Sequence, residues 1–427
     1  MFLRRSAAAL AAAAVLCGYA APAALADDRP KGPSDKPAPK LPDGLYGKGD
    51  PKFDGVWRQS VALLAQDAAG AVPAAKAVDW LAGQQCADGS FAAYRQDPKS
   101  GCDPKKTPAD TNATSLAVQA LAAVGGQAQA VEKAVTWLKS AQNKDGGWGF
   151  GASGPSDANS TSVVIGALSA AGEKPGEVKK GGESPYDALL SLQVGCGTKG
   201  AKPKERGAFA YQPGKDGALA ANDDATAAAA LAALGEGMAV EPLGEKAEDR
   251  PLRPLDCGEK GKPSPETAAD AGSAYLASVL EKNGGHLNSA MPGAEGQPDY
   301  ANTADAVIAL AAGGHSAPAQ KSLDWLGRHL GDWDKAKNDP AALGILILAV
   351  HATGGDPTTL HGTDLLKRLD ATGPAPAKTP AEQKTSDEDD GNGGAIAAWS
   401  AIIAGLAAGA GIGFLISGRR KRRGAGQ

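Results

Sequence analysis

The stretch WLKSAQNKDGGWGF, Trp137 to Phe150, holds two of the seven tryptophans of the chain, with a glutamine and a glycine pair between them. Its outline, W-L-x-x-x-Q-x-x-x-G-x-W, returns elsewhere in the same order. An outline repeated in register indicates an internal repeat, and the repeat decides the architecture before any single motif does. The other copies are WLAGQQCADGSF (80–91), ALLSLQVGCG (188–197, with Gly197 in the glycine place), YLASVLEKNGGH (275–286) and the start alone at 325–326.

A second unit follows each copy. It opens with a cluster of Asp, Asn and Thr, continues as a small apolar helix and closes on Gly. The polar start suits helix N-caps and the glycine suits a left-handed exit. These helices are apolar around most of their circumference, so protein should surround them. The segments are DTNATSLAVQALAAVGG (110–126), DANSTSVVIGALSAAG (157–172), NDDATAAAALAALG (222–235), DYANTADAVIALAAGG (299–314) and NDPAALGILILAVHATGG (338–355).

Counting the helices predicts an all-α fold. With a leading member at 56–70, there are six inner helices that alternate with six outer ones. The pattern favours a closed α6/α6 toroid, and an open superhelix of helical hairpins is the alternative. Gln142 should tie the turn after its outer helix, and Trp148 should wedge between repeats. The outer helices should begin near Ala74, Ala128, Pro185, Pro265, Ala317 and Pro357.

The two ends of the chain suggest export and anchoring. Residues 1–26 have two arginines, an apolar run and Ala24-Leu25-Ala26, as a cleaved signal peptide does. Residues 395–417 carry no charge and precede a basic tail at 418–427, which describes one transmembrane helix with a cytoplasmic end. Lipidation at Cys17 and sortase attachment at Leu369–Gly373 are the lesser alternatives.

The remainder divides by composition. We expect a flexible segment at 27–49, the toroid at 50–370 and a disordered stalk at 371–394. The predicted location is the cell membrane, with a single span and the toroid outside the cell. A net charge of −4 implies no nucleic-acid partner.

Four cysteines remain once the signal peptide is removed. An even number outside the cell suggests two disulfides, and sequence alone allows three pairings. We favour Cys86–Cys102 and Cys196–Cys257, because each closes a loop between neighbouring elements. A zinc site lacks support, since no C-x-x-C spacing occurs, and no metal site is predicted.

The repeats resemble the QW repeats of squalene–hopene cyclases and the toroid of protein prenyltransferase β-subunits. They are similar also to the α-domain of the cobalamin carriers, transcobalamin and intrinsic factor. The resemblance covers most of 50–370 and implies the toroid fold. It does not fix an activity, because one fold hosts many functions.

The catalytic motifs of the resembled enzymes are missing or misplaced. The acidic D-x-D-D of the cyclases has its only literal match at Asp387–Asp390, in the predicted stalk. Asp256 and Cys257 are adjacent, whereas the prenyltransferase zinc site needs Asp-x-Cys. A glycan-active enzyme, using His286, Tyr300 and Asp299, stays an alternative. No catalytic residue is assigned, and the chain is more easily explained as a binding protein.

In the cobalamin carriers, residues at the starts of inner helices contact the amides of the corrin. The resemblance therefore implies a funnel of polar side chains at one mouth of the toroid, with a corrinoid as one candidate ligand. Helix capping is the alternative role of these residues. The carriers close over their ligand with a β-domain that this sequence lacks, so a separate lid or transporter is an expected partner. The candidates are Asp110, Asn112, Thr114, Asp157, Asn159, Thr161, Asn222, Asp223, Thr226, Asp299, Asn302 and Thr303.

Three functional hypotheses follow. The first is a membrane-anchored toroid that captures a ligand for uptake. The second is an enzyme of the prenyltransferase, squalene cyclase or glycan-active toroid class. The third is a scaffold that recruits a partner protein.

Overall fold

The computed structural model describes residues 41–244, 248–258 and 261–380. The predicted signal peptide (1–26), membrane span (395–417) and basic tail (418–427) lie outside these residues. Helices within the described ranges are all too short or too polar to cross a membrane. The chain divides into two compact units, Met1–Ala377 and Lys378–Gln427, and the first contains the toroid.

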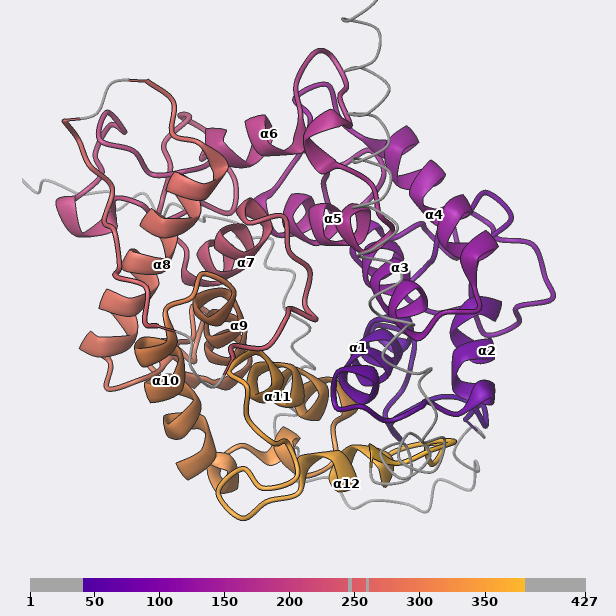
Figure 1. Ribbon diagram of the computed structural model, residues 1–427. Coiled ribbons are helices and arrows are strands. Elements are labelled where there is room, and N and C mark those ends of the chain that lie inside the picture. The colour runs from indigo at the N-terminus through magenta and orange to yellow at the C-terminus, as the bar shows by residue number, and fades with distance from the viewer. Residues whose placement is uncertain (1–40, 245–247, 259–260, 381–427) are drawn as a thin grey trace, which may run out of the picture. The chain divides into compact units, whose positions relative to one another are not determined.

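Six inner helices form a closed ring (Figure 1). Each contacts the next, and the last, α11, contacts the first, α1, so the predicted closure is confirmed and the open superhelix is wrong. The ring consists of α1 (Gly55–Ala68), α3 (Thr111–Val124), α5 (Ala158–Ala170), α7 (Asp223–Ala233), α9 (Tyr300–Ala312) and α11 (Pro340–Ala352).

Six outer helices surround this ring in the described residues, and five of them begin within a residue of the predicted positions. The sixth does not, because residues 356–364 form turns closed by the Asp356 side chain and by a bridge between Leu360 and Thr363. The outer helices are α2 (Ala75–Gly83), α4 (Ala128–Ala141), α6 (Pro185–Ser191), α8 (Pro265–Lys282), α10 (Ser316–Arg328) and α12 (Leu365–Asp370).

Short elements connect the two layers. Strands β1 (Leu287–Asn288) and β2 (Pro298–Asp299) pair antiparallel just before α9. Four 3₁₀ turns complete the described secondary structure: η1 (Pro175–Glu177), η2 (Pro203–Glu205), η3 (Leu330–Asp332) and η4 (Asp334–Lys337).

The core lies between the two rings. Leu81, Leu138 and Leu326, on outer helices, are fully buried against residues of the inner helices. The inner helix α11 has eleven buried residues among its thirteen, as its continuous apolar run PAALGILILAVHA predicts. Burial of apolar area at about 25 cal/mol per Å² is the main force holding such layers together.

The glutamine of the repeat ties its turn as predicted. The Gln142 amide donates to the Gly146 carbonyl at 2.9 Å and to the Val178 carbonyl of the next repeat at 3.1 Å. Gln85 makes the same pair of bonds with Gly89 and Ala130. The motif glutamine therefore joins neighbouring repeats as well as closing its own turn.

The third copy of the repeat corrects one alignment. Gln193 donates to the carbonyl of Gly207, at 3.1 Å, and not to Gly197. A ten-residue insertion carries Cys196 and pushes the matching glycine downstream. Gly207 lies at φ 89°, a left-handed conformation that favours glycine, as Gly146 does at φ 86°.

Trp148 fills the space between two repeats. Its side chain is 1% exposed, and its indole N–H donates to the Leu138 carbonyl of α4 at 2.7 Å. Its backbone N–H donates to Thr161 of α5 at 3.1 Å. The predicted wedge is confirmed.

The toroid extends beyond the predicted limits of 50 and 370. Tyr46 is fully buried, and its hydroxyl lies 2.7 Å from the Pro374 carbonyl and 3.0 Å from the Gln66 amide oxygen. Residues 41–49 and 371–377 therefore join the first and last repeats. Their Pro-rich composition resembles a linker, but the buried tyrosine makes them part of the fold.

Both favoured disulfides are confirmed. Cys86 bonds Cys102 across 16 residues, and Cys196 bonds Cys257 across 61 residues. Cys257 is oxidised, so it is not a zinc ligand.

The segment between α7 and α8 crosses the C-terminal side of the inner ring (Figure 1). We call residues 236–244 and 248–258 the strap. Met238 N–H donates to the Gln119 side chain of α3 at 2.9 Å, and Leu243 N–H donates to the carbonyl of Ala352, the last residue of α11, at 3.0 Å. Arg250 N–H donates to Gly314, just after α9. The sequence did not predict this strap.

Candidate ligand-binding site

The first residue of four of the five predicted polar clusters caps an inner helix, and in the fifth the cap of α11 is the second residue, Asp339. Each side chain accepts a hydrogen bond from the backbone N–H three residues further on, which satisfies one of the free donors of the first turn. Burial raises the pKa of both Asp110 and Asp157 to about 6, partly offset by these bonds. The acceptor distances are 2.9 Å for Asp110, 2.7 Å for Asp157, 2.8 Å for Asn222 and 3.1 Å for Asp299.

The threonine four residues after each cap is turned toward the outer layer. Its hydroxyl accepts from the backbone of the preceding turn. The hydroxyls of Thr114, Thr226 and Thr303 donate to the carbonyl of the cap residue, and that of Thr161 donates to the Trp148 carbonyl. Two backbone segments are thereby tied together, so the threonines have a structural role. The N–H donors are Phe91 to Thr114, Trp148 to Thr161, Phe209 to Thr226 and Leu287 to Thr303, at 2.9, 3.1, 2.9 and 3.0 Å.

The residue two positions after each cap lies on the opposite side of its helix. Two residues are about 200° apart around an α-helix, so this position faces the axis of the ring when the threonine faces outward. It is occupied by Asn112 in α3, Asn159 in α5 and Asp224 in α7, all half-buried. The Asn159 amide donates to the Asp224 carboxylate at 2.7 Å, which joins two neighbouring inner helices.

Asp305 faces the axis from α9. It lies six residues after its cap, on the side of the helix away from Thr303. Burial first, and then the charges of Asp224 and Asp299, raise the pKa of Asp305 to about 8. Its carboxyl is therefore mostly protonated at neutral pH. Asp224 likewise has a pKa raised by burial, although the Asn159 bond lowers it in part.

Ser162 lies beside this group. It follows Asn159 by one turn, on the flank where Ala158 and Ile165 of α5 pack against Ala225 of α7. Its side chain is 5% exposed, and its hydroxyl has no partner. Four further buried side-chain oxygens in the described residues lack partners, on Thr111, Asn112, Asn159 and Asn288, and those of Asn112 and Asn159 are at axial positions. We call Asn112, Asn159, Ser162, Asp224 and Asp305 the axial polar cluster.

Two predicted residues lie at the side of this cluster. Asp223 accepts a hydrogen bond from the Tyr275 hydroxyl of α8 at 2.7 Å, so its carboxylate is drawn toward the outer layer. The Asn302 amide donates to its own cap, Asp299, at 2.9 Å. Both side chains therefore make hydrogen bonds within the protein.

By helical phase, the axial group contains two of the twelve predicted residues, Asn112 and Asn159, and the Asn159–Asp224 hydrogen bond links it across two helices. Asp224, Asp305 and Ser162 join it without having been predicted. A signal for them existed, because Asp224 and Asp305 interrupt apolar helices on the face opposite the threonines. The remaining predicted residues are engaged in capping and turn contacts.

The inner helix α11 is apolar at the same level. The two positions of α11 that match the axial ones are Ala341 and Ile345, and Trp57 is half-buried on α1. A bound molecule would therefore meet acceptors on α3, α5, α7 and α9 and hydrocarbon on α11. Such a mixed lining is typical of ligand sites.

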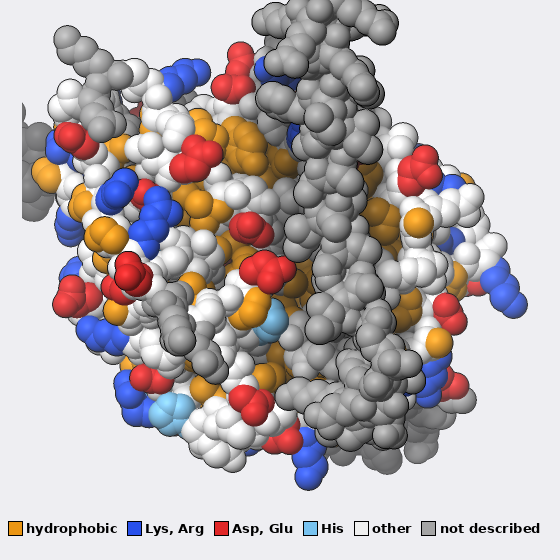
Figure 2. Space-filling view, in the orientation of Figure 1, with side chains coloured by type: hydrophobic (Ala, Val, Ile, Leu, Met, Phe, Trp, Pro, Cys, Tyr) orange, Lys and Arg blue, Asp and Glu red, His pale blue; other side chains and the backbone are white. Residues whose placement is uncertain are grey.

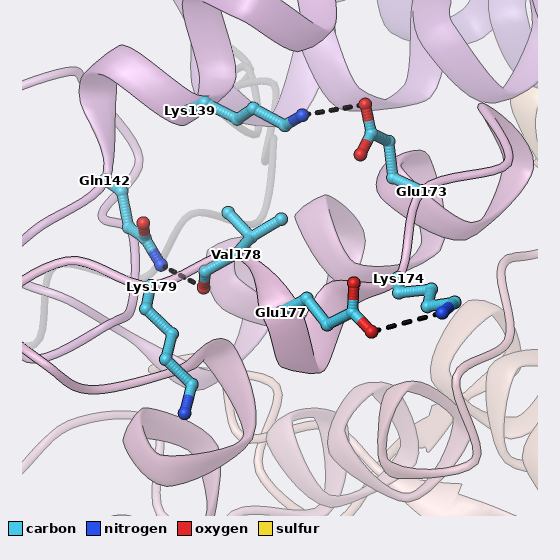
Figure 3. Close-up of a pocket in the computed structure, with 7 residues that line it drawn as sticks. All are labelled: Lys139, Gln142, Glu173, Lys174, Glu177, Val178 and Lys179. Atoms are coloured by element: carbon cyan, nitrogen blue, oxygen red, sulfur yellow. Dashed lines mark hydrogen bonds and ion pairs between the residues drawn. The ribbon is translucent and has the colours of Figure 1, made fainter. Parts of the chain in front are cut away.

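Two surface depressions lie away from this cluster. The first, of about 370 Å³, is lined by residues of α4 and of the loop around η1, and its charges are largely paired with one another (Figure 3). Lys139 contacts Glu173 at 2.7 Å, and Lys174 contacts Glu177 at 3.1 Å. The second, of about 400 Å³, lies along α12. Exposed ion pairs of this kind contribute little and mark no site.

Two of the residues proposed for glycan chemistry, His286 and Tyr300, pack against the same tryptophan, Trp325. The ring centroids of His286 and Tyr300 lie 4.5 and 5.3 Å from that of Trp325. Asp299 is the N-cap of α9. Within the described ranges, no group of three His, Cys, Asp or Glu side chains is placed to hold a metal ion.

Charges of both signs are interspersed around the face shown in Figure 2. This part of the described surface has no extended basic area of the kind that binds nucleic acid.

A family model described as the prenyltransferase alpha-alpha toroid domain matches residues 58–194. This part of the chain is therefore similar to a toroid domain of the prenyltransferase type. The match covers less than half of the chain and names no activity for it. The axial cluster is completed by residues beyond it, on α7 and α9.

One solved structure that the chain resembles is a crystal structure of a protein from Actinoplanes. It shares 17% sequence identity, with 72% of this chain and 99% of that chain covered, at a TM-score of 0.31. No curated protein matches the chain.

Proposed function

We propose that the toroid binds a small molecule at the N-terminal end of its inner ring, through the axial polar cluster. The observation that carries this proposal is the set of buried oxygens without partners, on Asn112, Asn159 and Ser162. Buried polar atoms in proteins are nearly always paired. Leaving one unpaired costs about 1–3 kcal/mol, which a ligand with hydrogen-bond donors would recover.

The ligand should enter from the N-terminal side. The strap crosses the opposite side and is bonded to α3, to the last residue of α11 and to the residue after α9. A corrinoid, fringed with amides, is one candidate. Capture for uptake would then require a lid or transporter as a separate partner, as the sequence predicted.

We further propose that the toroid acts outside the cell. Two disulfides support an exported protein, because such bonds persist in oxidising compartments. Anchoring by residues 395–417 remains a prediction of the sequence.

Isothermal titration of residues 27–394 with cyanocobalamin and cobinamide tests the corrinoid version. Binding that is weakened about tenfold or more in Asn159→Ala would support it, because the alanine removes one bond to the ligand and the tie to Asp224. Heat from neither corrinoid would remove this ligand class. Recovery of a polypeptide alone in pull-downs would favour a scaffold instead.

Asp305 gives a reason to keep an enzyme as the second candidate. A carboxyl with a pKa of about 8 is protonated at neutral pH and lies in the axial region, as a general acid requires. Turnover of an isoprenoid or a glycan that disappears in Asp305→Asn would support this function. Screening both substrate classes without turnover would leave the binding function as the better account.

A further inference from the structure

No described basic residue is among the influences on the two carboxyl groups of the axial polar cluster, Asp224 and Asp305. The pKa of Asp305 is raised by burial and by the carboxyl groups of Asp224 and Asp299. The pKa of Asp224 is raised by burial, lowered by the hydrogen bond from the Asn159 amide, and raised by Asp299 and Asp223. Lys282 lowers the pKa of Asp223, which lies at the side of the cluster.

The free hydrogen-bonding atoms of the cluster are mainly acceptors. The unpaired oxygens of Asn112 and Asn159 are amide carbonyls, which accept only. The Asn159 amide N–H already donates a hydrogen bond to Asp224. Asp224 as a carboxylate, and Asp305 once it is ionised, likewise accept only. The Ser162 hydroxyl, buried and unpaired, accepts or donates. The missing partner must therefore be rich in donors.

A protonated amine meets both requirements. An ammonium group offers three donors and no acceptor, and its positive charge suits a pair of carboxyl groups. A metal ion fits less well, because the described residues place no three ligating side chains together. The apolar positions Ala341 and Ile345 opposite would accept the hydrocarbon part of the molecule.

Resting on the proposed ligand-binding function, we infer that the axial polar cluster recognises an organic ammonium group, held between Asp224 and Asp305 and completed by the oxygens of Asn159 and Ser162. Burying an ammonium group requires paired charge and hydrogen bonds, and the cluster supplies both. The ligand class is thus an aliphatic amine.

The pH dependence of binding provides an independent signature. The titratable groups that face Asp305 are Asp224 on α7 and Asp299 before α9. On the other neighbour, α11, the described titratable residue is His351, in its last turn. A cation favours the ionised form of Asp305, so amine affinity should rise between pH 6 and pH 9.

The experiment uses the full-length protein and a matched pair of probes, 1,4-diaminobutane and the neutral 1,4-butanediol. The diamine should bind and raise the melting temperature, and the diol should not. Asp224→Asn and Asp305→Asn should each weaken diamine binding about tenfold or more, since each removes a charge-assisted bond. Asp79→Asn, an exposed carboxylate on α2, is the control and should bind as wild type does.

Three other results would overturn the inference. Equal responses to the diamine and the diol, or no response to the diamine, would show that the charge is not recognised. Binding of Ca²⁺ or Mg²⁺ that depends on Asp224 would make the site a metal site. Cyanocobalamin binding that depends on Asn159 but falls as pH rises would leave the ligand-binding function in place and exclude an ammonium ligand. If Asn159→Ala affects no probe, the ligand-binding function itself fails.

Discussion

Asp305 shows how one buried carboxyl affects stability. Its pKa of about 8 in the folded protein exceeds that of an unfolded aspartate, about 3.9. The folded state therefore keeps a proton that the unfolded chain loses between about pH 4 and pH 8, and the free energy of unfolding falls across that window. Asp305→Asn should remove this loss. We expect the variant to gain about 1–3 kcal/mol over wild type at pH 8.5, and to differ little at pH 4.5.

Denaturant unfolding of both proteins at the two pH values provides the measurement. Asp79→Asn, exposed on α2, serves as the control and should show no such pH-dependent gain. A constant difference between Asp305→Asn and wild type at both pH values would contradict a protonated Asp305.

Asp157 should matter for stability more than for binding. Its carboxylate accepts from the Ser160 N–H at 2.7 Å and from the Ser160 hydroxyl at 2.8 Å. Asp157→Ala should cost about 1–2 kcal/mol, as the loss of an N-cap does, with unchanged ligand affinity. Melting curves and titrations on the same samples test both halves. Lower affinity at unchanged stability would restore Asp157 as a ligand-contacting residue.

At this scale the sequence identified the polar starts of the helices but not the direction of each side chain. Cap residues and axial residues have the same composition and differ only in helical phase. Asn112 and Asn159 were named with their capping neighbours for that reason. Asp224 and Asp305 were missed because capping attracts attention to the first polar residue of a helix. The partnerless oxygens follow only from three-dimensional packing.

The outer helices and their turns depend on the motif glutamine. Gln142 donates to the carbonyls of Gly146 and Val178, and its side chain is buried. Gln142→Ala would leave both carbonyls unpaired, at an expected cost of about 2–4 kcal/mol in the free energy of unfolding. Gln127→Ala, ahead of α4 and without a cap bond, is the matched control and should cost under about 0.5 kcal/mol. Similar costs for both would show that the turn does not need the amide.

The strap depends on the second disulfide. Cys196–Cys257 spans 61 residues and Cys86–Cys102 spans 16. Loop-closure entropy predicts contributions of about 4 and about 3 kcal/mol to the free energy of unfolding. Replacing each pair with serine should therefore destabilise the protein, more strongly for Cys196 and Cys257. Chemical denaturation of the two double variants compares them, and the reverse order would show that the strap is held mainly by its hydrogen bonds.

The elements themselves were largely predictable. Periodicity and caps located all six inner helices, because buried helices with polar starts have a strong pattern. The start of α12 was misplaced because the Asp356 turn and the Asp364 cap resemble one another in sequence. The strap was missed because its sequence shows neither the helical nor the strand period of apolar residues. Its contacts are long-range hydrogen bonds to Gln119, Ala352 and Gly314.

Closure of the ring is a property of the whole molecule. It was predictable from six alternating pairs, but the residues that complete it were not. Tyr46 lies in a segment with the composition of a linker, and its partner Pro374 is 328 residues away. Only the folded structure shows that the two ends of the toroid meet.

The final prediction concerns this closure. Gln66 donates to Asp370 at 2.6 Å, Gly47 N–H donates to the Thr372 carbonyl at 2.9 Å, and Ala377 N–H donates to the Val72 carbonyl at 2.7 Å. A chain that ends at Asp370 would lose the last two bonds and uncover the Tyr46 ring. The bond of the Tyr46 hydroxyl to the Pro374 carbonyl is lost as well. Three lost hydrogen bonds at about 1 kcal/mol each, with the exposed ring, give an expected loss of about 4–6 kcal/mol.

Differential scanning calorimetry of chains ending at Asp370 and at Pro380 measures this loss. The Pro380 chain retains every contact of the closure and is the control. Tyr46→Phe in the longer chain should show a smaller decrease, about 1–2 kcal/mol, because only the hydroxyl is removed. Since α1 and α11 also pack directly, the shorter chain should still fold, with a lower melting temperature. Equal melting temperatures for the two chains would mean that packing of α1 against α11 closes the ring without help from residues 371–377.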